Sequence, residues 1–130
     1  MKKILAGLFT LGALTLSLQA YDQAERIQDM QTMEISMAEI QRGILYNNKE
    51  MVLKGVESLK KTSNKVEVSK KDDMDYSAAF AKNQTKNIIR YADKLQASIE
   101  ANQKHAATTN YTKVLNQCVS CHNKIRKWNQ

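Results

Sequence analysis

Residues 22–46 read DQAERIQDMQTMEISMAEIQRGILY, and this stretch decides the class of fold. Its apolar residues recur at steps of three and four, which places them in one stripe along one side of a helix. Asp22 and Glu25 stand three residues apart ahead of the stripe, as the two members of a capping box do. The pattern stops at Asn47-Asn48, and asparagine tolerates the left-handed backbone of helix ends. The predicted helix over about 22–46 carries on its inner side Ile27, Met30, Met33, Met37, Ile40, Ile44 and Leu45.

The rest of the chain favours further helices. Beyond residue 20 it has no proline and only two glycines, Gly43 and Gly55, so it lacks the residues that usually separate strands. Periodicity predicts three more helices, over about 49–61, about 72–104 and from Thr108 or Thr109 to about Trp128, with 62–71 as the long connection. We expect an all-α chain folded as an antiparallel four-helix bundle.

The predicted third helix begins in the acidic run 72–75, because the helix dipole favours negative charge there. Asn83, Gln84 and Asn87 interrupt its apolar stripe, and no reason for them is evident from the sequence. The expected inner face of this helix comprises Tyr76, Phe80, Ile88, Tyr91, Leu95 and Ile99. That of the last helix comprises Tyr111, Val114, Leu115, Cys118, Cys121 or His122, and Ile125.

Residues 1–20 have the layout of a secretory signal peptide. Lys2 and Lys3 precede an uncharged run from Ile4 to Leu18, and Ala20 is a suitable cleavage residue. The run is shorter than the roughly 20 residues that span a bilayer, although it could also stay as an anchor. We therefore expect removal of 1–20, export to the periplasm, and one domain over 21–130.

The charge of the chain does not indicate a nucleic-acid binder. The formal net charge is +7, but the lysines are spread along the sequence, and only five tyrosines, two phenylalanines and one tryptophan are available to stack on bases. A modest positive charge can instead steer a protein toward acidic partners or an anionic membrane surface.

The strongest local signal is Cys118-Val119-Ser120-Cys121-His122, which contains the only two cysteines of the chain. Cysteines at this spacing lie one helical turn apart, and each thiol can add across one vinyl group of a haem. The histidine that follows can then bind the iron as proximal ligand. A disulfide, a thioredoxin-like redox pair, or a zinc site that also uses His105 are the alternatives. We predict one covalently attached haem c, with its iron.

The pattern Cys118-x-x-Cys121-His122-x-x-x-Arg126 on the last predicted helix resembles the class II cytochromes c, the family of cytochrome c-prime and its low-spin, methionine-ligated relatives. The order and lengths of the predicted helices extend the resemblance over residues 21–130, although 62–71 lacks the prolines often seen in that loop. The resemblance implies a mono-haem four-helix bundle in which His122 is the proximal ligand. It also implies that Arg126 lies beside a haem propionate and that the first helix covers the distal side.

In this family the distal residue on the first helix decides the function. A methionine gives six-coordinate iron suited to electron transfer, whereas an apolar residue leaves an open site for NO or CO. In the methionine-ligated relatives the ligand lies about four turns before the end of the first helix, and counting back that far from Asn47-Asn48 reaches Met33. The resemblance therefore implies Met33 as the distal ligand, with Met30 or Met37 as alternatives. Methionine also fills core space, so an open site is the competing interpretation.

We therefore expect a periplasmic electron carrier and not an enzyme, with a gas-binding haem protein as the alternative. A haem-free structural or metal-carrying bundle is the third interpretation. The expected partners are periplasmic or membrane redox proteins with acidic surfaces, docked by Lys124, Arg126 and Lys127, and no nucleic acid. Relatives often pair through their first two helices, so a homodimer is one expected assembly.

Overall fold

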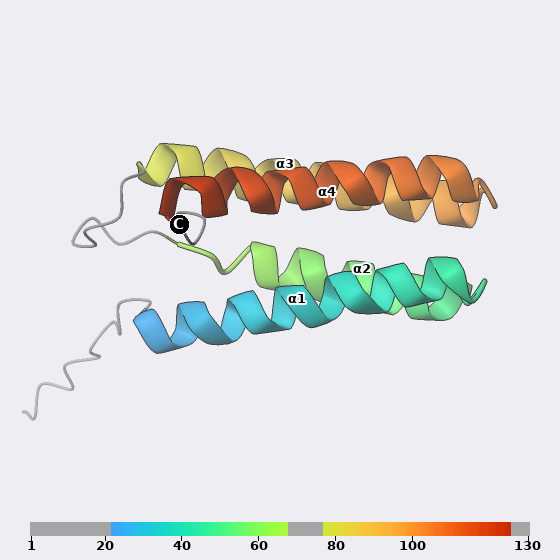
Figure 1. The fold of residues 1–130 in the computed structure, drawn as a ribbon, viewed down its shortest axis with the longest axis horizontal. Coiled ribbons are helices and arrows are strands. Elements are labelled where there is room, and N and C mark those ends of the chain that lie inside the picture. The colour runs from blue at the N-terminus through green and yellow to red at the C-terminus, as the bar shows by residue number, and fades with distance from the viewer. Residues whose placement is uncertain (1–21, 68–76, 126–130) are drawn as a thin grey trace, which may run out of the picture.

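The computed structural model describes residues 22–67 and 77–125. Within them it has helices α1 (Gln23–Leu45), α2 (Lys49–Ser63), α3 (Ala78–Glu100) and α4 (Lys104–Ile125), and no strand. The predicted all-α class and four-helix bundle are confirmed (Figure 1). None of these helices has the length and apolar character needed to cross a membrane.

The bundle consists of two helical hairpins laid against each other (Figure 1). Helix α1 packs extensively on α2, and α3 packs extensively on α4. Contact between α2 and α3 is smaller, and α1 and α4 touch least of all. Both hairpin loops lie at one end of the bundle, which we call the closed end. The start of α1 and the end of α4 lie together at the other end, which we call the open end.

The start of α1 is a complete capping box, as predicted. The Glu25 backbone N–H donates to Asp22 Oδ1 at 2.8 Å, and the Asp22 backbone N–H donates to Glu25 Oε2 at 3.0 Å. The end of α1 also follows the prediction, because Asn47 adopts a left-handed φ of 56°. Asn48 then caps α2 by accepting a 3.0 Å hydrogen bond from the Met51 backbone N–H. The two asparagines thus end one helix and begin the next.

The predicted bounds of the third helix are wrong at both ends. Ser77 has an extended backbone and caps α3 by accepting from the Phe80 N–H at 3.1 Å, so no helix continues from the acidic run into α3. The acidic run itself lies outside the described residues. At the other end Asn102 has a φ of 59°, and the Gln103 N–H donates to the Ser98 carbonyl at 2.8 Å. This left-handed turn closes α3 at Glu100.

Helix α4 consequently begins at Lys104, ahead of the predicted cap at Thr108 or Thr109. Both threonine hydroxyls donate at 3.0 Å to the carbonyl four residues earlier, Thr108 to Lys104 and Thr109 to His105. These bonds place both residues inside the helix, since a capping side chain would instead accept from a backbone N–H.

The core lies along the bundle axis and includes predicted inner residues from all four helices. Its members with less than a tenth of their surface exposed include Met33, Met37, Ile40, Val52, Val56, Leu59, Ile88, Leu95, Ile99 and Val114. Five residues predicted to face inward are instead exposed: Ile27 at 51%, Met30 at 36%, Leu45 at 67%, Leu115 at 43% and Ile125 at 36%. Ile27 and Leu45 lie near the two ends of α1, beyond the packed centre. Leu115 lies on α4, whose contact with α1 is small.

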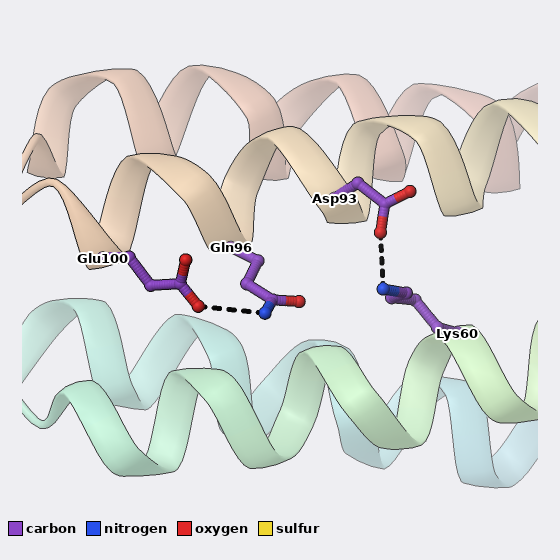
Figure 2. A network of polar contacts seen from close by, with 4 residues as sticks. All are labelled: Lys60, Asp93, Gln96 and Glu100. Atoms are coloured by element: carbon purple, nitrogen blue, oxygen red, sulfur yellow. Dashed lines mark hydrogen bonds and ion pairs between the residues drawn. The ribbon is translucent and has the colours of Figure 1, made fainter.

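The two hairpins are joined by polar contacts as well as by the core. Lys60 on α2 forms an ion pair with Asp93 on α3, and Gln96 hydrogen-bonds Glu100 along α3 (Figure 2). The Lys60 and Asp93 side chains are 31% and 54% exposed, so this pair contributes little to stability. At the closed end the Lys49 ammonium donates to the Glu100 carbonyl at 3.2 Å.

Candidate functional site

The end of α4 brings the predicted attachment residues to the open end of the bundle. Cys118 and Cys121 are both partly buried, and Cys118 packs against the hydrophobic core. Their spacing of one turn leaves both thiols on the inner side of the helix. His122 is exposed on the flank of the same turn. The geometry therefore presents two thiols inward and an imidazole beside them.

Both thiols are free, and burial keeps them protonated. Burial raises the pKa of Cys118 from its ordinary 9.0 to about 11, with a further increase from the charge on Cys121. Burial also raises the pKa of Cys121. A thioredoxin-like pair needs the opposite change, because its attacking cysteine works as a stabilised thiolate. These environments do not favour the redox-pair alternative.

One contact fixes the register between α1 and α4. The Tyr111 hydroxyl donates to Gln41 Oε1 at 3.3 Å. Met33 lies eight residues from Gln41 toward the open end, and Val119 lies eight residues from Tyr111 in the same direction. Eight residues correspond to about 12 Å along either helix. Met33 is therefore level with the segment between Cys118 and His122. It belongs to the buried core, with only 6% of its surface exposed.

The other two methionines of α1 lie at different levels. Met37 is 8% exposed and sits four residues nearer the closed end than Met33, which is about 6 Å along the helix. Met30 is 36% exposed and sits about 4.5 Å nearer the open end, level with His122. Met33 and Met30 are thus the two methionines of α1 that are level with the segment from Cys118 to His122.

A buried amide on α3 was not recognised from the sequence as part of the site. Gln84 is 8% exposed, and its Oε1 is buried without a hydrogen-bond partner. Lys124 lies 6.0 Å from the ring centre of Phe80, which fixes the register of α3 against α4. Gln84 lies four residues after Phe80, and Ser120 lies four residues before Lys124, so Gln84 is level with Ser120, the neighbour of Cys121. The only signal for it in the sequence was the interruption of the apolar stripe.

Some predicted residues fall elsewhere. Residues 1–20, Arg126 and Lys127 lie outside the described residues, so their predicted roles remain predictions. His105 is exposed on the first turn of α4, at the closed end and far from the cysteines. Across 22–67 and 77–125, no three His, Cys, Asp or Glu side chains gather closely enough to hold a metal ion. The zinc alternative therefore has no ligand set there.

Comparison with known protein families, curated proteins and solved structures finds no match for this chain. The likeness to class II cytochromes c thus depends on the motif of α4 and on the bundle that carries it.

Proposed function

We propose that this chain is a periplasmic mono-haem c-type cytochrome that carries electrons. The observation that carries the proposal is the arrangement at the end of α4. There Cys118 and Cys121 lie one turn apart on the inner side of the helix, and His122 lies beside them at the open end of the bundle. A haem joined to both thiols needs this spacing, and its iron needs a neighbouring imidazole.

The seam between α1 and α4 fits a large apolar group. These two helices approach each other along fewer residues than any other packed pair of the four described helices. Apolar side chains on their facing turns are also unusually exposed. On α1, Ile27 and Met30 are 51% and 36% exposed, and both lie on the same helical face as Gln41. On α4, Leu115 and Val119 follow Tyr111 at steps of four and are 43% and 44% exposed. A porphyrin in the seam would cover this surface.

The chain's own residues then have distinct tasks. Each thiol would add across a vinyl group, with the sulfur bonding to one carbon and the hydrogen going to the other, so no atom is lost. The Cys118 and Cys121 thioethers would hold the group against the bundle, and the His122 ring nitrogen would bind the iron. The bound haem supplies one-electron oxidation and reduction. Met33 would supply the sixth ligand, and His/Met ligation raises the reduction potential.

The second candidate function is binding of NO or CO at an open iron. The observation that favours it is the position of Met33 inside the hydrophobic core, where methionine commonly serves only to fill space. In that case the iron would keep a vacant position on the inner side, and the protein would capture small gases instead of transferring electrons.

The surroundings of the site suggest how partners dock. Lys124 is exposed on the last described turn of α4, and Arg126 and Lys127 follow it in the sequence. We propose that Arg126 approaches a haem propionate and that Lys124 and Lys127 attract acidic redox proteins. A homodimer through α1 and α2 is also proposed, since Ile35 on α1 is 61% exposed.

The test is an absorption spectrum of the reduced protein, produced with haem-attachment machinery, before and after addition of CO. The matched control is the Cys118→Ala/Cys121→Ala variant, which keeps the bundle and removes both attachment atoms. We expect covalent haem in the natural chain only, with sharp low-spin bands that ignore CO. A colourless natural chain would overturn the proposal in favour of a haem-free bundle. High-spin bands that shift with CO would replace electron transfer by gas binding.

A further inference from the structure

The buried amide of Gln84 is unusual for its surroundings. It occupies the same face of α3 as Ala81, Ile88 and Leu95, which are all buried and apolar. Its Oε1 is shielded from solvent and accepts no hydrogen bond. An unpaired buried oxygen is costly, because it has lost its bonds to water without replacement. Buried groups of this kind are commonly satisfied by a bound water molecule or a ligand.

The position of Gln84 relates it to the proposed haem site. It is level with Ser120, the neighbour of Cys121, when the α3–α4 register is counted from the Lys124 and Phe80 pair. The proposed proximal ligand, His122, is exposed on the flank of α4. Met33 is buried toward the bundle axis, as Gln84 is. Gln84 and Met33 therefore both face the interior of the bundle, whereas His122 does not.

We infer that the Gln84 carboxamide hydrogen-bonds a small molecule held on the inner, sixth-ligand side of the haem whenever the methionine thioether does not fill that position. This inference rests on the proposed function. An amide suits the task because its oxygen can accept from a water molecule. After a half-turn about its last bond, its N–H can donate to a bound diatomic gas. Polar groups on this side of a haem govern which small molecules bind there.

The first test uses CO as the probe in the haem-bearing Met33→Leu protein, where the sixth position is open. The C–O stretching frequency is measured with Gln84 and with Gln84→Leu. Gln84 is replaced by leucine and not by methionine, because a methionine sulfur at position 84 could itself bind the iron. An N–H aimed at the bound gas draws electron density onto its oxygen and weakens the C–O bond. We therefore expect the frequency to rise when Gln84 is replaced.

The matched control is Gln96→Leu, which makes the same chemical change on the same helix. Gln96 lies twelve residues nearer the closed end, about 18 Å away, and its amide is bonded to Glu100 (Figure 2). We expect it to leave the frequency unchanged. If haem is attached and Gln84→Leu also leaves the frequency unchanged, the inference is overturned while the proposed function stands. A chain that attaches no haem overturns both.

The second test needs no haem. In the Cys118→Ala/Cys121→Ala protein, Gln84→Leu removes an oxygen that has no partner, so Tm should rise by about 5 °C. A fall in Tm would mean that the amide is satisfied within the bundle and would contradict the inference. The control Gln96→Leu should not raise Tm, because it breaks an existing hydrogen bond.

Discussion

Replacing Met33 by leucine should open the sixth coordination position of the haem without unfolding the bundle. Leucine and methionine have similar volumes, so this swap in the core should cost less than about 1.5 kcal/mol. That corresponds to a fall in Tm of no more than about 10 °C for a domain of this size. The reduction potential should also fall, because His/Met ligation is what raises it.

Matched variants at the other two methionines of α1 make the prediction specific. Met37 lies about 6 Å along α1 from Met33, too far for its sulfur to replace that of Met33 without moving the helix. Met37→Leu should therefore keep the six-coordinate spectrum. Met30, at 36% exposure, lies at the rim of the site, and Met30→Leu should also keep it.

The assay is the spectrum of each reduced variant with and without CO, together with its reduction potential. Only Met33→Leu should gain CO binding. If Met30→Leu gains CO binding and Met33→Leu does not, then Met30 is the ligand. The register of α1 against α4 inferred from Tyr111 and Gln41 would then be wrong by about one turn. If the natural chain already binds CO, Met33 is a packing residue and the iron is open.

Three further predictions concern the thiols, the helix packing and the docking surface. In haem-free protein at pH 8, Cys118 with its pKa of about 11 should react with an alkylating agent about tenfold more slowly than an ordinary thiol. This figure combines a roughly hundredfold smaller thiolate fraction with a partly compensating gain in nucleophilicity. The same raised pKa favours the folded state below pH 9.0, so denaturation should show stability falling as pH rises toward 11; a flat profile would contradict the burial of this thiol. Gly55→Ala would place a methyl group 2.9 Å from the Ser36 carbonyl oxygen and should destabilise the bundle by about 1–3 kcal/mol in urea titrations, whereas an unchanged midpoint would mean that α1 and α2 can separate freely. Replacing Lys124 and Lys127 by glutamate should slow electron transfer to an acidic redox partner at low salt, and rates independent of both charge and salt would exclude this docking surface.

Much of the fold could be predicted from local chemistry. The capping box of Asp22 and Glu25 and the pair Asn47-Asn48 act through bonds between residues close in sequence, and the structure has both as predicted. Helix bounds were less predictable where local signals competed. The acidic run suggested a start for α3, but Ser77 caps it. No glycine marked its end, where Asn102 takes the left-handed conformation.

By itself the sequence determined the helical class, the one-turn spacing of Cys118 and Cys121, and the adjacent His122, because each depends only on residue type and separation along a helix. Only the tertiary structure decided the levels of Met33 and Gln84 relative to those cysteines. Both levels depend on how one helix slides against another, which is set by contacts between residues far apart in the chain, such as Tyr111 with Gln41. The raised pKa of Cys118 and the unpaired Gln84 oxygen have the same origin. Burial is a property of the packed bundle, and a sequence pattern indicates which face turns inward without showing which polar atoms lose their water there.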